Sequence, residues 1–138
     1  NPFIHSHGLI LGTGGSAKAV KYIFDKYDIK YKYVSRKPSA DSFSYEQLTK
    51  AIMSKYKLIV NTTPLGMFPN VVEAPPIPYE FLTQEHFLFD LIYNPAKTLF
   101  LKKGEEHGAF IQNGFDMLVQ QAEVNWKVWN TDEEPTDL

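Results

Sequence analysis

The 138-residue sequence contains no cysteine, which excludes disulfides, zinc–cysteine sites and a thiol nucleophile. No apolar run approaches the roughly 18 residues of a membrane span, and the longest, such as Leu58-Ile59-Val60, have the length of strands. The 14 basic and 16 acidic residues give a net charge of −2, so the overall charge favours neither nucleic acid nor an anionic membrane. We therefore expect no nucleic-acid partner, no membrane partner and a cytoplasmic location, since a chain without cysteine suits a reducing compartment.

Hydrophobic residues make up 43% of the chain and charged residues 22%, as is typical of a single globular domain. Short apolar runs alternate with helical segments: we expect strands at 8–11, 31–34, 57–61, 86–93 and 109–112, and helices at 16–27, 44–56, 98–107 and 114–129. This alternation predicts an α/β fold, a doubly wound parallel sheet with helices on both faces. Five prolines within residues 64–78 predict a long irregular loop.

The first expected strand leads directly into Gly12-Thr13-Gly14-Gly15-Ser16-Ala17, which matches the G-x-G-x-x-A pattern of dinucleotide-binding loops. Gly12 permits a tight turn, Gly14 lets the backbone approach a pyrophosphate, and the following helix offers its free N–H groups to the phosphates. A strand before the loop and a helix after it are the context that this pattern needs. The loop thus predicts a Rossmann-like domain that binds a dinucleotide, with a glycine-rich turn that binds no ligand as the alternative.

The second expected strand ends in Ser35-Arg36-Lys37, where NAD-binding domains usually carry an acidic residue for the ribose 2′-hydroxyl. Two cations and a hydroxyl suit a 2′-phosphate, the group that distinguishes NADP from NAD. The alternative is a solvated basic pair. Elsewhere, His5-Ser6-His7 is more typical of a solvated chain end than of a metal site, and we expect no metal.

Three further motifs follow later strands at the edge where open α/β sheets bind ligands. They are Asn61-Thr62-Thr63-Pro64-Leu65-Gly66-Met67, Asp90-Leu91-Ile92-Tyr93-Asn94-Pro95, and Gly114-Phe115-Asp116-Met117-Leu118-Val119-Gln120-Gln121. Together with the glycine loop and the basic cluster, in this order, they resemble the C-terminal half of shikimate dehydrogenase over about residues 8–129. The resemblance implies reduction of 3-dehydroshikimate to shikimate with NADPH, in the pathway to chorismate and the aromatic amino acids.

The resemblance also implies roles for individual residues. Gly12, Thr13, Gly14, Gly15 and Ser16 match the family's pyrophosphate loop, and Ser35 and Arg36 match its asparagine–arginine pair. Lys37 stands where a threonine is usual, and Ala40 stands where many members carry a second arginine. The positions that line the ribose and nicotinamide correspond to Thr63, Leu91, Gly114 and Met117, and those that hydrogen-bond the substrate correspond to Tyr93 and Gln121.

The family's catalytic lysine and aspartate belong to an N-terminal substrate domain, and no part of this sequence matches that domain. We therefore expect an isolated NADP-binding domain with no catalytic residue of its own, followed by an acidic tail at 131–138. A quinate/shikimate dehydrogenase that prefers NAD is disfavoured by the missing acidic residue. A stand-alone nucleotide-sensing module is the other alternative, although it would not need the substrate-facing pair Tyr93 and Gln121. The oligomeric state stays open.

Overall fold

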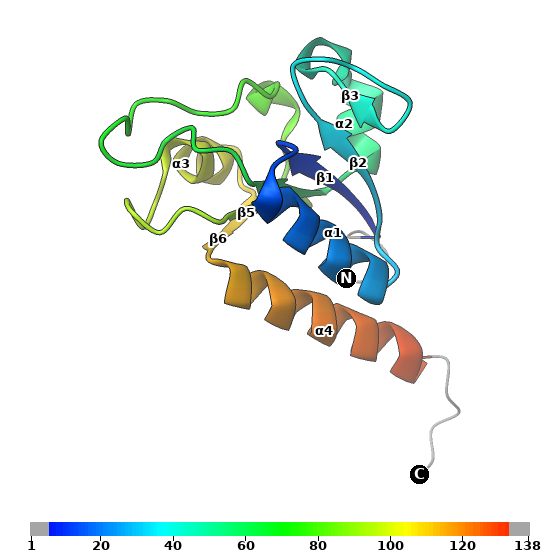
Figure 1. Ribbon diagram of the computed structural model, residues 1–138. Coiled ribbons are helices and arrows are strands. Elements are labelled where there is room, and N and C mark those ends of the chain that lie inside the picture. The colour runs from blue at the N-terminus through cyan, green and yellow to red at the C-terminus, as the bar shows by residue number, and fades with distance from the viewer. Residues whose placement is uncertain (1–5, 133–138) are drawn as a thin grey trace.

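The computed structural model describes residues 6–132, and within this range six strands form one parallel sheet in the order β3-β2-β1-β4-β5-β6 (Figure 1). The strands are β1 His7–Leu11, β2 Lys30–Val34, β3 Ser42–Phe43, β4 Leu58–Asn61, β5 Phe87–Asp90 and β6 Phe110–Asn113. The helices are α1 Gly15–Lys26, α2 Lys50–Lys55, α3 Leu99–Glu106 and α4 Phe115–Asp132, with short 3-10 helices η1 Tyr45–Gln47 and η2 Tyr79–Phe81. This strand order is that of the Rossmann fold, so the predicted fold class is confirmed.

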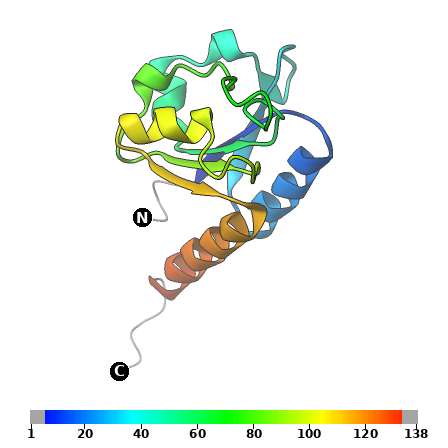
Figure 2. The same ribbon diagram turned by 90° about the vertical axis from the view of Figure 1, so that its left-hand side faces the viewer.

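Helices cover both faces of the sheet, as Figure 2 shows, with α2 and α3 above it and α1 and α4 below. Apart from His7, Asn61 and Asp90 at their ends, the central strands β1, β4 and β5 carry only apolar residues and one glycine, because successive side chains point into two different cores. In β4, Ile59 joins the core between the sheet and α2 and α3, whereas Leu58 and Val60 join the core between the sheet and α1 and α4. Among residues 6–132, no helix combines the length and apolarity that crossing a bilayer requires.

The expected helix at 44–56 is wrong, because two capping residues divide it. Ser44 and Gln47 do form a capping box, but it starts only the short η1. The chain then turns Leu48 into the core, and Thr49 caps α2 by accepting a hydrogen bond from the Ile52 backbone N–H at 3.3 Å. The two-residue β3 before this segment was missed, since so short a strand has no detectable periodicity.

Other element boundaries also differ from the expectation. The fourth expected strand ends at Asp90 rather than residue 93, because the Asp90 carboxylate accepts the Ile92 N–H and turns the chain. Helix α4 runs on to Asp132, into the expected tail, and residues 133–138 lie outside the described range. His7 is not part of a solvated end: it begins β1 and its ring packs edge-on against Tyr56, while His5 lies outside the described residues.

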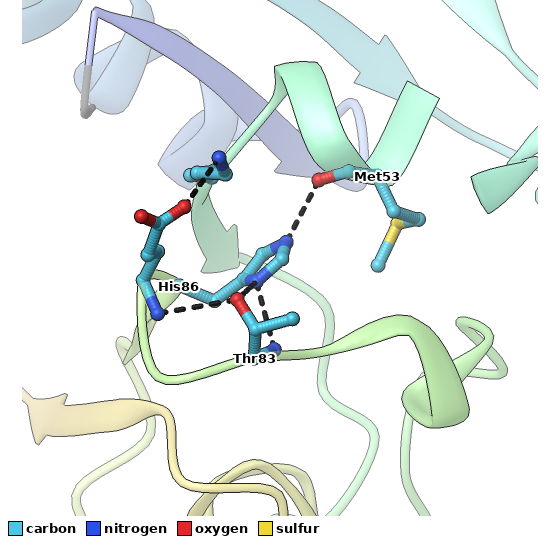
Figure 3. Close-up of polar contacts among 5 residues, drawn as sticks. Met53, Thr83 and His86 are labelled. Atoms are coloured by element: carbon cyan, nitrogen blue, oxygen red, sulfur yellow. Dashed lines mark hydrogen bonds and ion pairs between the residues drawn. The ribbon is translucent and has the colours of Figure 1, made fainter. Parts of the chain in front are cut away.

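His86 fastens the amino end of β5 to α2 (Figure 3). The His86 ring is buried, and its Nε2 lies 2.7 Å from the Met53 carbonyl oxygen. Its Nδ1 accepts a hydrogen bond from the Thr83 backbone N–H at 3.0 Å. Because Nδ1 faces a donor, Nε2 must carry the proton that it gives to Met53. Both bonds therefore require a neutral imidazole, and burial lowers the pKa of His86 accordingly.

Candidate nucleotide-binding site

Five adjacent strands end level with one another at a single edge of the sheet. Leu11 pairs with both Val34 and Asn61, Asn61 pairs with Asp90, and Asp90 pairs with Asn113. The segments that follow these residues must therefore lie side by side. They contain every site residue predicted from the sequence: Gly12, Thr13, Gly14, Gly15, Ser16, Ser35, Arg36, Lys37, Thr63, Leu91, Tyr93, Gly114, Met117 and Gln121.

The turn after β1 sits at the point where the strand order reverses, between β2 and β4. The Gly12 N–H donates to the Val34 carbonyl at 2.9 Å, and the Thr62 N–H donates to the Leu11 carbonyl at 2.9 Å. Gly12 has a φ of +105°, and a Cβ there would lie 2.7 Å from the Thr62 hydroxyl oxygen. Only glycine satisfies both conditions, as the sequence motif predicted.

The N-terminus of α1 presents unoccupied donors toward open space. Gly14 is its N-cap, no side chain caps the helix, and its first turn carries no acidic residue. A Cβ built on Gly14 or Gly15 would meet nothing within 4 Å. The first N–H groups of the helix and its positive dipole end thus face space that an anion can enter.

A groove of about 920 Å³ joins this glycine loop to the basic cluster after β2. One part of the groove is lined by Ser35, Arg36 and Lys37. Another part is lined by the Pro-rich loop after β4, which contributes the carboxylate of Glu73. The full lining is Gly12, Thr13, Val34, Ser35, Arg36, Lys37, Tyr45, Thr63, Pro64, Leu65, Val72, Glu73, Ala74 and Pro76. Tyr45 was not predicted, because it reaches the groove only through the unexpected η1.

A buried hydrogen-bond network fixes the segments that follow β4 and β5. The Asp90 carboxylate accepts the Thr98 hydroxyl at 2.6 Å, the Ile92 N–H at 3.0 Å and the Asn61 side-chain amide at 3.2 Å. The Asn61 side-chain oxygen in turn accepts the backbone N–H and the hydroxyl of Thr63, at 3.0 and 2.7 Å. Thr63 in the groove is therefore linked through one carboxylate to the loop that carries Tyr93.

Asp90 is fully buried, and this burial raises the pKa of its carboxyl group, while the hydrogen bonds from Thr98, Ile92 and Asn61 act in the opposite direction. The sequence motifs contain Asn61, Asp90 and Ile92, and Thr98 follows three residues after Pro95, but the sequence did not predict that these residues form a network. A signal was available: Asn61 and Asp90 are polar residues that directly follow fully apolar runs.

The remaining predicted residues lie along the same edge but outside the groove, beyond β5 and β6. Tyr93 is exposed, and its ring lies beside Gly114, where a Cβ would come within 3.3 Å of Tyr93 Cε1. Met117 lies three residues after Gly114 and Gln121 lies four residues after Met117, which places the two side chains on one face of α4. Leu91 follows β5 directly, its N–H donating to the Asn61 carbonyl at 3.2 Å.

Known proteins resemble this chain in both sequence and structure, although no family model matches it. The shikimate dehydrogenase (NADP(+)) of Caldicellulosiruptor saccharolyticus is 36% identical over 135 residues, covering 88% of this chain and 48% of that protein. The crystal structure of shikimate dehydrogenase 1 from Peptoclostridium difficile is 39% identical, with a TM-score of 0.66, covering 95% of this chain and 49% of that one.

A third relative is the Thermus thermophilus shikimate 5-dehydrogenase in complex with NADP(H) and shikimate, at 25% identity and a TM-score of 0.65, covering 90% of this chain and 49% of that one. The chain thus spans about half the length of the curated relatives it matches. The resemblance predicted from the five motifs is therefore confirmed: this chain is related to shikimate dehydrogenase over a stretch equal to about half of that enzyme.

Proposed function

We propose that this chain is the NADP-binding domain of a shikimate dehydrogenase, which reduces 3-dehydroshikimate to shikimate with NADPH in the cytoplasm. The observation that carries the proposal is that all five motifs follow adjacent strands at one sheet edge, where Gly12 and Thr13 of the glycine loop line one groove with the basic cluster. The catalytic domain implied by the resemblance would complete the active site, since residues 8–129 correspond to the cofactor-binding part alone.

The glycine loop would hold the pyrophosphate of the cofactor. Gly14 and Gly15 leave open the space in front of α1, and the uncapped N–H groups of the first turn supply donors to the phosphate oxygens. Thr13 and Ser16 flank these donors. The absence of an acidic side chain in the first turn keeps this end of the helix favourable for an anion.

The cluster after β2 would select NADP over NAD. Arg36 and Lys37 line the groove and provide two cations for the 2′-phosphate, a group that NAD lacks. The Ser35 hydroxyl donates to the Lys37 carbonyl at 2.7 Å and so shapes this turn. No acidic residue stands at the end of β2 to accept a ribose 2′-hydroxyl, as NAD-binding domains usually require.

The segments after β4, β5 and β6 would border the reactive end of the cofactor. Thr63, Leu91, Gly114 and Met117 would line its ribose and nicotinamide, and Tyr93 and Gln121 would hydrogen-bond the substrate. The bound cofactor supplies the hydride. The residues of this chain orient the two reactants, but a group from the catalytic domain must transfer the proton of the substrate hydroxyl.

Calorimetric titration with NADPH and NADH tests this proposal. A charge-assisted hydrogen bond contributes about 1.5–3 kcal/mol, so even one such bond predicts NADPH affinity about tenfold higher or more. The double substitution Arg36→Ala, Lys37→Ala should abolish that preference, whereas Lys50→Ala with Lys102→Ala, on helices outside the groove, should preserve it. Equal affinities of the native chain for the two nucleotides would refute the assignment of NADP.

Gly14→Val tests the position of the pyrophosphate. The new side chain has no protein neighbour within 4 Å of its Cβ, so the fold should persist, but it would occupy the space that the phosphates need. We expect a folded variant that loses at most about 1 kcal/mol of stability, since valine is a poorer N-cap than glycine, and that no longer binds NADPH. Retained binding by the folded variant would place the nucleotide elsewhere.

An activity assay separates this proposal from the alternative of a nucleotide sensor. With shikimate and NADP, residues 1–138 alone should form no NADPH, because substrate positioning can contribute ~7–11 kcal/mol and these residues would supply only the cofactor side of the site. Adding the substrate domain of a related shikimate dehydrogenase, fused ahead of residue 8, should restore turnover. A sensor would bind nucleotide and remain inactive in the fusion, and turnover by the chain alone would contradict the division of the site between two domains.

A further inference from the structure

Tyr45, which belongs to none of the five motifs, lies beside the basic cluster. It is the first residue of η1 and lines the groove of about 920 Å³ together with Arg36 and Lys37. It also lines an adjoining hollow of about 350 Å³, which it shares with Arg36, Glu46 and Pro76. Tyr45 and Arg36 thus border the same two spaces.

The Tyr45 hydroxyl has a proton that the rest of the described chain does not use. Within residues 6–132 it makes no hydrogen bond, and because no buried side-chain polar atom in this range lacks a partner, solvent must reach it. Two other hydroxyls that line the groove are already engaged as donors. Ser35 donates to the Lys37 carbonyl at 2.7 Å, and Thr63 donates to the Asn61 side chain at 2.7 Å.

The remainder of the Tyr45 side chain is held firmly. Its ring packs against the apolar core beneath α2 and α3, and the reciprocal capping box of Ser44 and Gln47 fixes the start of η1. Burial raises the pKa of Tyr45, and the nearby Arg36 opposes this effect. The phenol therefore keeps its proton at neutral pH and presents a positioned donor to the groove.

We propose that the Tyr45 hydroxyl donates a hydrogen bond to the 2′-phosphate of NADP and so acts with Arg36 and Lys37 as a specificity-determining residue. This inference rests on the proposed function, since it assumes that NADP occupies the groove. A phosphate oxygen is a strong, charged acceptor for a phenolic O–H. NAD has a neutral hydroxyl at the same ribose carbon, so the same donor would contribute much less to its binding.

Tyr45→Phe tests this inference, because it removes one oxygen that makes no contact within the described chain and keeps the packed ring. We expect the affinity for NADPH to fall about tenfold, equivalent to about 1.4 kcal/mol, and the affinity for NADH to stay within about twofold. Tyr33→Phe is the matched control, since Tyr33 lies on β2 but faces a different hollow with Lys21 and Asp41. It should change neither affinity.

A second measurement follows the phosphate itself. In phosphorus NMR of bound NADP, losing a donor should raise the pKa of the 2′-phosphate, because the dianion is less stabilised. Unchanged NADPH affinity in Tyr45→Phe would overturn the inference, as would equal losses for NADPH and NADH, which would assign Tyr45 to the shared adenosine or to the fold. If Arg36→Ala, Lys37→Ala weakens NADPH binding while Tyr45→Phe does not, only this inference fails; if neither does, the proposed function fails as well.

Discussion

Thr98→Val should destabilise the domain far more than its small change in shape suggests. Thr98 is fully buried, and its hydroxyl donates to Asp90 Oδ2 at 2.6 Å. The Thr98 hydroxyl oxygen also accepts the Leu101 N–H at 3.3 Å and thereby caps α3. Valine has nearly the same volume but can neither donate nor accept, so both interactions are lost without creating a cavity.

The size of the effect follows from these two interactions. A hydrogen bond to a charged group contributes about 1.5–3 kcal/mol, and an N-cap contributes about 1 kcal/mol. We therefore expect Thr98→Val to reduce the free energy of unfolding by about 2.5–4 kcal/mol. A domain of ordinary stability has only about 5–15 kcal/mol in total, so the shift is large enough to measure directly.

Equilibrium unfolding in urea provides the measurement, and Thr98→Ser provides the matched control. Serine keeps the hydroxyl and loses one methyl group, which should cost about 1 kcal/mol. The valine variant should therefore be less stable than the serine variant by at least about 1.5 kcal/mol. Equal losses in the two variants would show that packing of the methyl group, and not the bond to Asp90, determines the stability of this position.

Two further predictions concern buried positions away from the groove. Gly104→Ala should lower the free energy of unfolding by about 1–3 kcal/mol in denaturant titrations, because the new Cβ would lie 2.5 Å from Cδ2 of the buried Leu88. This clash should outweigh the better helix propensity of alanine. Gly15→Ala is the control: its Cβ would have no neighbour within 4 Å, so it should not be destabilising. Burial holds the pKa of His86 below its usual 6.5, so its contribution to stability is full above pH 6.5 and is lost as the pH falls through the lowered value. When stability is measured at about pH 7.5 and about pH 5, the loss of stability at the lower pH should accordingly be smaller in His86→Gln than in the native chain. An equal loss in the two proteins would assign the pH dependence to other groups.

The sheet and the gathering of the motifs at one of its edges could be predicted from the sequence because both depend on local pattern. The apolar run at Leu58-Ile59-Val60 indicated a strand covered on both faces, and the structure places these side chains in two cores. The position of the glycine loop at the end of β1 followed from its place between an apolar run and an amphipathic segment. Since parallel strands end at a common edge, the motifs after them had to gather there.

The segment at 44–56 could not be predicted because its local signals compete. Ser44 and Thr49 are both good N-caps, and helical spacing of apolar residues fits a single helix across them. Tertiary burial of Leu48 favours two short helices, a choice that no local pattern encodes. Tyr45 reaches the groove only as a consequence of that choice, and so no motif indicated it.

The motifs at this edge combine two kinds of residue that the sequence does not distinguish. Asp90 and Tyr93 stand three positions apart in one motif, yet Asp90 is fully buried and Tyr93 is 65% exposed. Asp90 binds only other parts of the chain, whereas Tyr93 is open to a ligand. Because Asp90 also holds Asn61, and Asn61 holds Thr63, a single buried carboxylate fixes the distance between the groove and the loop of Tyr93. A substitution at Asp90 should therefore displace Thr63 in the groove and the loop of Tyr93 together.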